Sequence, residues 1–352
     1  MSDNSSYRIV FVNEASPLIG MGHILRDQVL ARMLDIRGYQ ISGLTIGDEK
    51  AVLYAQERCI GEHFDWPILT MPNATATIEH ILHDEPTLIL VDCTKASQDI
   101  VRGCINTNHP IVALDYFSSA QPLPAAVINL IDHNHATLAG QPPTRDGVAY
   151  YEGPEYAIIR DDFLAARVRR GIQSAKASIQ NILIAFGGAD PSGNSQRAVD
   201  MIIQWPGVFK VNIIIGPLFT SAIGPITDSL SDRCSIKTHT SPTNMDKLLE
   251  DADLVFCGGG GTLLEAMCVG TPAIVIAQNE AESRHAKSLA HREACWLLEE
   301  TSWEIVSQVN NRRWRSERAQ ACVDGLGAER VCNVIARQIE LKVKDHHHDI
   351  AS

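Results

Sequence analysis

The chain has 352 residues, and its 30 basic against 42 acidic side chains give a formal charge of −12. The length predicts two domains of about 150 residues each, and the acidic balance disfavours nucleic acid as a partner, because phosphate binding needs clustered Lys and Arg. The sequence contains neither an apolar run of the about 18 residues that span a membrane nor a secretory signal within residues 1–6, which favours a cytoplasmic location.

From the N-terminus, short β-branched runs alternate with stretches of helical period, the pattern of a parallel α/β fold. Residues 7–12 predict the first strand and residues 23–37 a helix that ends at Gly38. Further strands are expected at 40–46, 87–91, 111–114 and 126–131, with helices at 50–59, 75–83 and 97–104. These elements predict one nucleotide-binding-like domain.

A second series of strands follows a connecting helix predicted over 161–178. Its strands are expected at 181–186, 208–215, 234–238, 254–257 and 273–277. We therefore expect an α/β protein with an N-terminal Rossmann-like domain over 1–165, a C-terminal one over 166–340, and a flexible tail over 341–352. Two such halves are expected to face each other across a cleft that holds the ligand.

Glycine-bearing loops occur where strands should pass into helices, and the start of a helix is where anions bind. The first loop, residues 19–23, reads Ile-Gly-Met-Gly-His, and Leu25 at the third small-residue position excludes a dinucleotide fingerprint. In the second loop, residues 187–194, glycine allows close approach of backbone to a ligand, and Asp190 or Ser192 is a candidate helix cap.

The third loop is a run of four glycines, Gly258–Gly261. No Lys follows it, which excludes a Walker loop, and its lack of side chains favours close contact between backbone and a diphosphate. Glu265, one helical turn after Thr262, is placed to accept hydrogen bonds from ribose hydroxyls. The same two residues also fit a capping box, Thr-x-x-Glu, and the two interpretations are compatible.

His23 is the candidate catalytic residue, because it stands at the start of the first helix. The positive end of a helix disfavours imidazolium, which keeps the ring able to accept a proton from water or a hydroxyl. Arg26, three residues on, either binds an anionic ligand or pairs with Asp27 or Glu14.

Three aspartates, Asp92, Asp115 and Asp132, each follow a predicted strand, the usual place of functional carboxylates in open sheets. Turn formation explains them as well. The nine cysteines lack Cys-x-x-Cys pairs and predict reduced, buried thiols. The histidines at 346–348 have a metal-binding composition, but their position in the tail favours a solvated terminus.

Five blocks of the sequence, between residues 15 and 280, resemble one family in order. They are Ser-Pro-Leu-Ile-Gly-Met-Gly-His-Ile-Leu-Arg at 16–26, Gly-Pro-Glu-Tyr-Ala-Ile-Ile-Arg-Asp-Asp-Phe at 153–163, Gly-Gly-Ala-Asp-Pro at 187–191, the segment from Ala252-Asp253 to Gly270-Thr271-Pro272, and Ala-Gln-Asn-Glu at 277–280. The family is the UDP-2,4-diacetamido-2,4,6-trideoxy-β-L-altropyranose hydrolases of pseudaminic acid biosynthesis. The resemblance covers about three quarters of the chain.

The resemblance implies a GT-B-like pair of Rossmann-type domains, UDP bound by the C-terminal half, and no requirement for a metal ion or other cofactor. It implies that His23 serves the hydrolytic water, that Glu265 binds the ribose, and that Gly260, Gly261 and Thr262 contact the diphosphate. The full set of expected substrate-binding residues is Gly20, Gly22, Arg26, Gly188, Gly260, Gly261, Thr262, Glu265, Asn279 and Glu280.

The chain departs from the family pattern at several positions. The Arg-x-Asp before the first loop is Val12-Asn13-Glu14 here, and the cysteine after the motif arginine is Asp27. The run that should hold a tyrosine is Asp92-Cys93-Thr94, an aspartate pair is Asp115-Tyr116, and the Asn-Gln is Asn279-Glu280. Nearly all of these positions lie where a sugar would sit, so the nucleotide half is kept and the sugar half is rebuilt.

The leading hypothesis is a metal-independent hydrolase of a UDP-activated amino or deoxy sugar, in nonulosonic-acid or surface-glycan biosynthesis, in which His23 activates water. A GT-B glycosyltransferase would use the same donor site and would deprotonate an acceptor hydroxyl instead. A catalytically silent nucleotide-sugar binding protein is the third alternative. The sequence leaves the sugar and the oligomeric state open.

Overall fold

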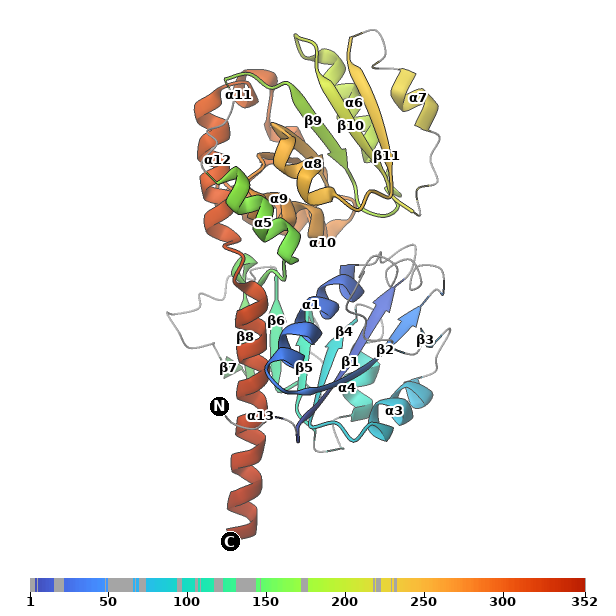
Figure 1. Cartoon of the computed structure of the whole chain (residues 1–352), viewed down its shortest axis with the longest axis vertical. Helices are drawn as coiled ribbons and strands as arrows, with labels where there is room; N and C mark the ends of the chain where they lie inside the picture. Colours follow the sequence, from blue (N-terminus) through green and yellow to red (C-terminus); the bar gives the residue numbers. More distant parts are fainter. Residues whose placement is uncertain are drawn as a thin grey trace. The chain divides into compact units, whose positions relative to one another are not determined.

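The computed structural model describes most of the chain (Figure 1). The residues left outside the description are 1–3, 5, 16–21, 48, 50–65, 67, 70–73, 94–96, 105–106, 108, 117–122, 131–143, 146, 172–176, 218, 220–222, 229, 231–232 and 352. The chain divides into an N-terminal unit, formed by Met1–Ile158 with Leu326–Ser352, and a C-terminal unit formed by Ile159–Gly325. Each unit is an α/β domain with its own sheet.

The N-terminal unit has an eight-stranded sheet in the order β3-β2-β1-β4-β5-β6-β8-β7. Its strands are parallel except that β7 pairs antiparallel with β8. The strands are β1 (Arg8–Ala15), β2 (Gln40–Gly47), β3 (Ile68–Leu69), β4 (Leu88–Asp92), β5 (Ile111–Leu114), β6 (Ala126–Asn129), β7 (Thr144–Arg145) and β8 (Val148–Glu152). The strand order runs outward in opposite senses from β1 and from β4, and such a switch point is where open α/β sheets bind ligands.

Alternate residues of each buried strand pack on opposite faces of this sheet, as the two-residue period of a strand requires. Ile9 and Phe11 of β1 pack with α1 (Gly22–Ile36) and α13 (Gly327–Ala351). Val10 and Val12 pack in a second core with α3 (Ala74–His83) and α4 (Ser97–Cys104). The continuous apolar runs of β1 and β4 therefore reflect burial on both faces.

The C-terminal helix α13 belongs to the N-terminal unit, which corrects the expected domain boundaries. Val331, Ile335 and Ile339, spaced by about one turn, lie in the same core as Leu30 of α1. The expected C-terminal domain over 166–340 therefore loses its last residues to the other unit. The helix continues to Ala351, so the residues expected as a flexible tail over 341–352 are largely helical.

The C-terminal unit has a six-stranded parallel sheet in the order β11-β10-β9-β12-β13-β14. Its strands are β9 (Asn181–Ala185), β10 (Lys210–Ile215), β11 (Ser235–Thr240), β12 (Leu254–Cys257), β13 (Ala273–Val275) and β14 (Trp296–Leu297). Its helices are α5 (Asp161–Arg170), α6 (Asn194–Gln204), α7 (Ile223–Asp228), α8 (Met245–Asp251), α9 (Gly261–Val269), α10 (Glu280–His291), α11 (Trp303–Val306) and α12 (Val309–Cys322), with short 3-10 turns η2 (Pro154–Tyr156, in the N-terminal unit) and η3 (Leu298–Glu300).

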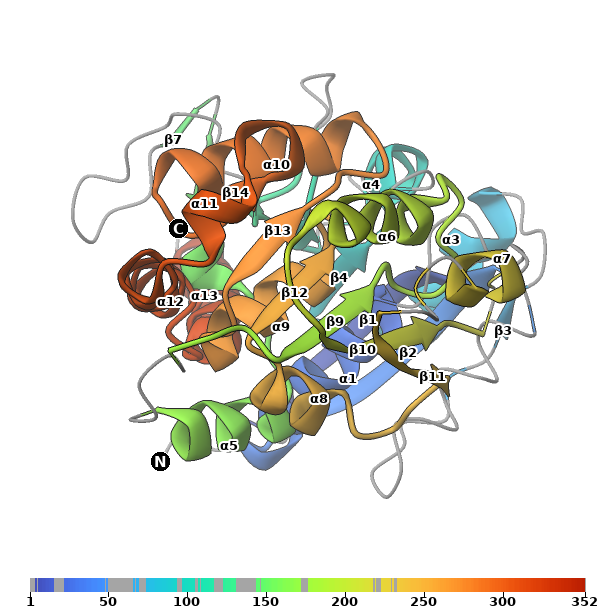
Figure 2. The same cartoon turned by 90° about the horizontal axis from the view of Figure 1, so that it is seen from above.

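Helices cover both faces of this sheet, with α6 and α10 on one side and α8 and α9 on the other (Figure 2). The core on the α6 side gathers Ile184, Phe256 and Ile274 with an aromatic group around Trp205, whose ring centroid lies 5.3 Å from that of Trp303. Within the described part of the chain, no helix is long and apolar enough to span a membrane.

Most of the predicted elements are present, several with shifted ends. The first strand runs on to Ala15, three residues beyond the prediction. The connecting helix ends at Arg170 rather than at 178. Strands β3, β7, β8 and β14 were not expected. Three of them, β3, β7 and β14, have two residues each, which is too short to show a period in the sequence. The predicted helix at 50–59 lies outside the described residues.

Candidate functional site

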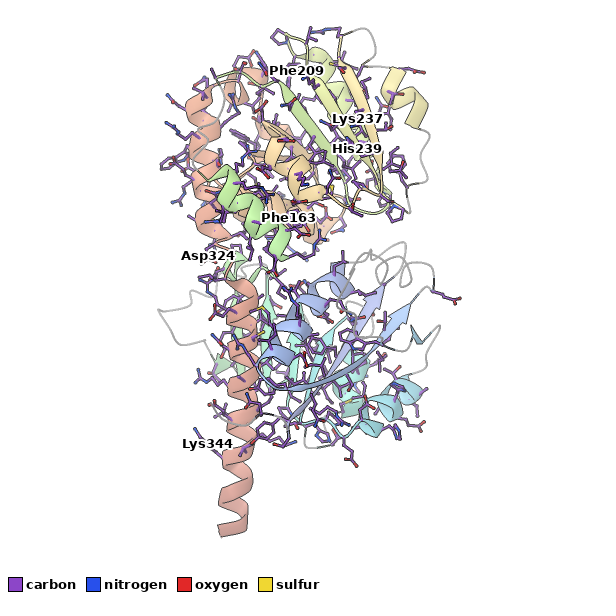
Figure 3. All side chains as sticks on the ribbon, in the orientation of Figure 1. Phe163, Phe209, Lys237, His239, Asp324 and Lys344 are labelled. Carbon is purple, nitrogen blue, oxygen red and sulfur yellow. The ribbon has the colours of Figure 1, made fainter. Side chains whose placement is uncertain are left out.

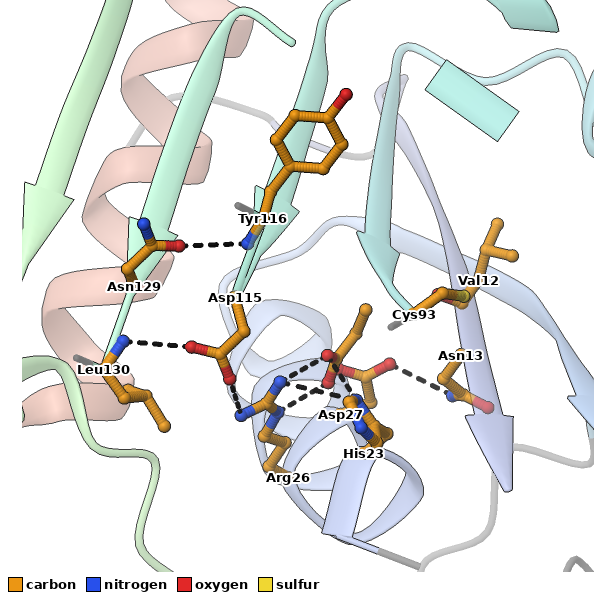
Figure 4. Close-up of polar contacts among 11 residues, drawn as sticks. Val12, Asn13, His23, Arg26, Asp27, Cys93, Asp115, Tyr116, Asn129 and Leu130 are labelled. Atoms are coloured by element: carbon orange, nitrogen blue, oxygen red, sulfur yellow. Dashed lines mark hydrogen bonds and ion pairs between the residues drawn. The ribbon is translucent and has the colours of Figure 1, made fainter. Parts of the chain in front are cut away.

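His23, the second residue of α1, lies against a buried carboxylate at the end of β4. Its Nδ1 is 2.6 Å from Oδ1 of Asp92 (Figure 4). The His23 side chain is 13% exposed and that of Asp92 is 0% exposed. An Nδ1–H that donates to Asp92 leaves Nε2 with its lone pair, which is the arrangement that makes histidine a general base.

Arg26, one turn along α1, joins two strand-end carboxylates (Figure 4). Its Nε donates to Oδ2 of Asp92 at 2.6 Å, its Nη2 donates to Oδ1 of Asp92, and its Nη1 donates to Oδ2 of Asp115 at 2.7 Å. From the sequence, we expected Arg26 either to bind an anionic ligand or to pair with Asp27 or Glu14. Arg26 instead pairs with two of the aspartates that end predicted strands.

Further strand ends continue this polar edge. Asp115 has a positive φ of 48°, and its Oδ1 accepts the backbone N–H of Leu130 at 3.0 Å. Asn129 accepts the backbone N–H of Tyr116 at 3.0 Å, and its amide approaches Oε1 of Glu152 at 3.4 Å. These strands are parallel, so their polar carboxyl ends lie at one edge of the sheet.

The charges in this cluster shift the acidity of its members. Burial alone would raise the pKa of the Asp92 carboxyl, but the Arg26 guanidinium and His23 outweigh it and hold that pKa well below its usual range. Burial would lower the pKa of Arg26, and Asp92 and Asp115 reverse that effect. Asp92 is therefore an anion and Arg26 a cation at any ordinary pH.

In the C-terminal unit, a carboxylate from α10 fixes the glycine loop after β12. Oε2 of Glu282 accepts the backbone N–H groups of Gly259 and Gln278, both at 2.9 Å. His285, one turn further along α10, contacts the carbonyl oxygen of Gly259 through Nδ1 at 2.7 Å. The loop is therefore held by charged and polar groups that sequence reasoning did not assign.

The four glycines of this loop do different things. A Cβ on Gly259 would lie 2.5 Å from the backbone oxygen of Glu282, and one on Gly258 would lie 2.8 Å from Oε2 of the same residue, so these two are needed for packing. A Cβ on Gly261 meets no atom within 4 Å. Packing inside the protein therefore explains why Gly258 and Gly259 are glycines, but it does not explain the glycine at 261.

Helix α9 begins at Gly261 with Gly260 as its N-cap, and no side chain caps it. Thr262 is thus inside the helix, and the capping box that would pair it with Glu265 is not formed. The N–H groups in the first turn of a helix lack intrahelical partners and carry the positive end of the helix dipole. Gly261 and Thr262 accordingly present an uncapped helix start, which suits an anion.

Glu265, the expected ribose ligand, lies on α9 beside Arg160. Oε1 of Glu265 is 3.7 Å from Nη2 of Arg160, and both side chains are partly exposed. Burial raises the pKa of Glu265, and Arg160 opposes that effect. Arg160 also lies over the ring of Phe163, with 4.8 Å between its guanidinium carbon and the ring centroid (Phe163 is labelled in Figure 3).

The second glycine loop is closed by its own aspartate. Asp190, with a φ of 47°, accepts the backbone N–H groups of Asn194 and Ser195 at 2.8 and 2.9 Å. The N-cap of α6 is Gly193, and Asp190, three residues earlier, satisfies the first two N–H groups of the helix. A Cβ on Gly188 meets nothing within 4 Å, so space is open beside that residue.

Asn279 and Glu280 stand at the start of α10. Oδ1 of Asn279 accepts the backbone N–H of Glu282 at 2.9 Å, so Asn279 caps the helix. Glu280 is exposed and pairs with Arg284 at 3.0 Å on the helix surface. Asn279 therefore has a local structural role through its side-chain oxygen, and its side-chain N–H groups take no part in the cap.

The structure brings His23, Gly22 and Arg26 together on α1, and it groups Gly188, Gly260, Gly261, Thr262, Glu265, Asn279 and Glu280 in the C-terminal unit. Gly20 and Asp132 lie outside the described residues. The partner of His23 was not assigned from sequence, although Asp92 was recognisable as a strand-end aspartate. Glu282 gave no comparable signal. Among the described residues, no three His, Cys, Asp or Glu side chains group as metal ligands.

Comparison with known proteins relates the chain to glycosyltransferases and to polysaccharide biosynthesis. Residues 220–321 match the glycosyltransferase family 28 C-terminal domain. The chain is 26% identical to the spore coat polysaccharide biosynthesis protein SpsG of Bacillus subtilis, over 78% of each protein. It is 24% identical to the uncharacterized protein MJ1062 of Methanocaldococcus jannaschii, over 78% of this chain, and spans 56% of that protein's length.

Solved structures share the whole architecture. MurG of Acinetobacter baumannii superposes with a TM-score of 0.66 at 17% identity, over 94% of this chain and 99% of that one. The UDP-GlcNAc 2-epimerase of Neisseria meningitidis, solved with UDP-GlcNAc bound, gives 0.58 at 12% identity, over 94% and 100%. The chain has the GT-B fold. The expectation of two Rossmann-like domains is thereby confirmed.

Proposed function

We propose that this chain hydrolyses a UDP-activated amino or deoxy sugar to UDP and free sugar, without a metal ion, in nonulosonic-acid or surface-glycan biosynthesis. The observation that carries the proposal is the 2.6 Å contact between Nδ1 of His23 and the buried carboxylate of Asp92. This contact orients the ring and leaves Nε2 as the acceptor for a proton of water.

The nucleotide is assigned to the C-terminal unit. Support comes from the uncapped start of α9 at Gly261 and Thr262, from the open space beside Gly261, and from the family 28 match that includes this loop. The epimerase of the same fold was solved with a UDP-sugar. Glu265 would accept hydrogen bonds from the ribose, which its partial exposure permits.

In the proposed step, water attacks the anomeric carbon while Nε2 of His23 takes one of its protons. The bond between the anomeric carbon and the diphosphate oxygen breaks, and the electron pair leaves with UDP. The helix start at Gly261 stabilises the negative charge that develops on the departing diphosphate. The Asp92 carboxylate stabilises the imidazolium that forms at His23.

A glycosyltransferase is the second candidate function, and the family 28 match favours it. In that reaction, Nε2 of His23 would take the proton of an acceptor hydroxyl rather than that of water. The same nucleotide site and the same leaving group serve both reactions. The two differ only in the nucleophile, so product analysis with and without an acceptor distinguishes them.

The test is NMR product analysis of UDP-2,4-diacetamido-2,4,6-trideoxyaltrose and of UDP-N-acetylhexosamines, without acceptor or metal. We expect free sugar and UDP from the wild type, and a turnover lower by about 10²–10⁴-fold in His23→Ala, the usual contribution of a general base. His239→Ala is the matched control, because His239 contacts Asn212 on the C-terminal sheet (labelled in Figure 3). This variant should turn over normally.

Two outcomes contradict the hydrolase. If UDP binds but sugar is released only when an acceptor is present, the chain is a glycosyltransferase. If UDP-sugars bind and no condition gives turnover, with His23→Ala matching the wild type throughout, the chain is a catalytically silent binding protein. Calorimetric titration with UDP, run on the same preparations, separates either case from loss of the nucleotide site.

A further inference from the structure

Asp27 is a buried carboxyl group with no part in the proposed reaction. It follows Arg26 on α1 and has 0% exposure. Its Oδ2 accepts the amide of Asn13 at 3.0 Å (Figure 4), while its Oδ1 has no hydrogen-bond partner among the described residues. Arg26 directs its hydrogen bonds to Asp92 and Asp115, so Asp27 receives none of them.

Asp27 and Asp92 are neighbours, because Asn13, whose amide donates to Asp27, is the residue of β1 that pairs with Asp92 in the register of β1 and β4. Both oxygens of Asp92 already accept hydrogen bonds from positively charged or donating groups, namely His23 and Arg26. Two carboxyl groups can share a hydrogen bond only if one of them carries a proton. Arg26 and His23 both donate hydrogen bonds to Asp92, which stabilises the negative charge on Asp92. The shared proton is therefore on Asp27.

We propose that Asp27 is a neutral carboxylic acid that donates a hydrogen bond to Asp92 and thereby acts as a positioning residue for His23. The consequence for catalysis rests on the proposed function of His23. An ionised Asp27 would add a third carboxylate to Asp92 and Asp115 around the Arg26 guanidinium. A neutral Asp27 instead adds a hydrogen-bond donor to the carboxylate that orients His23.

The surroundings of Asp27 agree with this assignment. Burial, followed by the negative charge of Asp92, raises the pKa of Asp27 well above its usual range, against smaller opposing effects of Asn13 and Arg26. In the described part of the chain, Cys93, after β4, also faces Asp27, and it faces Glu14 of β1 and Asp92 as well. Burial and these carboxyl groups raise the pKa of Cys93, so the thiol is neutral as well.

The proton can be observed directly. Infrared spectra of protein labelled with carbon-13 aspartate should show the carbonyl band of a protonated carboxyl at neutral pH. We expect Asp27→Asn to remove this band and Asp115→Asn, which changes an ion-paired carboxylate in the same network, to keep it. A wild-type spectrum without the band at neutral pH, or a band that survives in Asp27→Asn, would refute the assignment.

The proton also makes stability depend on pH. In the native state Asp27 keeps its proton, whereas an unfolded aspartate releases it above about pH 3.9. The stability contributed by Asp27 is therefore present below that pH and is lost as pH rises toward the folded-state pKa. Relative to Asp27→Asn, the unfolding constant of the wild type should rise about tenfold per pH unit over this window. A difference independent of pH would overturn the proposal.

Activity tests the positioning role. Asn is neutral and can donate a hydrogen bond to Asp92, so Asp27→Asn should keep kcat within about threefold and leave the pH–rate profile unchanged. Val cannot donate, so Asp27→Val should lower kcat tenfold or more while UDP still binds. Loss of turnover in a folded Asp27→Asn, or full turnover in Asp27→Val, would contradict the role. If the wild type hydrolyses nothing, the function fails, and the infrared band and the pH slope still decide the proton.

Discussion

At the carboxyl edge of the N-terminal sheet, side-chain charges meet, with Asp92 and Asp115 joined by Arg26 and with His23 on Asp92. At the corresponding edge of the C-terminal sheet, backbone N–H groups take the place of charged side chains, because α9 begins at Gly261 without a side-chain cap. Within the described residues, the carboxylate of Glu282 reaches that loop and accepts the N–H groups of Gly259 and Gln278. Two sheets whose first six strands follow the same order thus end in different chemistry.

The difference matches two different tasks. A proton-transfer group must be held in one orientation and one charge state, and buried ion pairs do this because a lost partner leaves an uncompensated charge. An anion site needs N–H groups without side chains in the way, and glycines at a helix start supply them. We therefore propose that the N-terminal unit carries the chemistry and the C-terminal unit binds the nucleotide, and the variants below test that division.

Among the variants that compare the two units, the largest effect is expected from Asp92→Asn. The amide cannot stabilise imidazolium and no longer selects the Nδ1–H form of His23, so kcat should fall by about 10³–10⁴-fold. UDP affinity should remain within about twofold, because Asp92 belongs to the N-terminal unit. Steady-state kinetics and calorimetric titration measure the two quantities separately.

Asp115→Asn is the matched control, since Asp115 pairs with Arg26 but has no contact with His23 among those described. We expect at most about a tenfold change in kcat, from a less well held Arg26. Equal losses of kcat in the two variants would show that the network acts only by stabilising the fold. The proposal that the N-terminal unit carries the chemistry would then be contradicted.

The sequence allowed much of this architecture to be predicted, because buried parallel strands have a clear signature. The strand at 111–114 and the helix at 97–104 were predicted with their observed bounds. The return of α13 to the N-terminal unit was not predictable, because an amphipathic helix shows that it packs but not against which core. Its apolar residues, such as Val331 and Ile335, suit either unit equally well as a pattern.

The site was partly predictable for a similar reason. The glycine run and His23 have distinctive local patterns, so they could be selected without a structure. The pairing of His23 with Asp92 spans 69 residues of sequence and depends on the parallel register of β1 and β4. Glu282 could not be selected, because a glutamate on an exposed-looking helix is ordinary until its two backbone contacts are seen.

A second test addresses the C-terminal half of the comparison. Gly261→Ala should fold normally, because the new methyl meets no protein atom within 4 Å and alanine is favourable in a helix. If the diphosphate contacts this backbone, the methyl should weaken UDP binding by about ten- to a hundredfold. Thermal unfolding and calorimetric titration on one preparation report both effects.

Gly259→Ala is its counterpart with the opposite expectation. Its methyl would lie 2.5 Å from the backbone oxygen of Glu282, so the variant should lose about 1–3 kcal/mol of unfolding free energy through overpacking. A Gly261→Ala protein that binds UDP as tightly as the wild type would remove the diphosphate from this helix start. The start of α9 would then have no proposed role in nucleotide binding.

The smallest effect concerns Asn279, which the resemblance assigns to substrate and the structure uses as the cap of α10. Asn279→Ala removes the acceptor of the Glu282 N–H and should lower the unfolding free energy by about 1 kcal/mol. Asn279→Asp keeps an equally good cap and removes only the amide donor, so its stability should stay within about 0.5 kcal/mol of the wild type. If that donor also contacts the sugar, kcat/KM in Asn279→Asp should fall about tenfold, the effect of leaving one substrate acceptor unpaired. Unchanged kcat/KM would restrict Asn279 to the cap, and the sugar would then be recognised by the N-terminal unit.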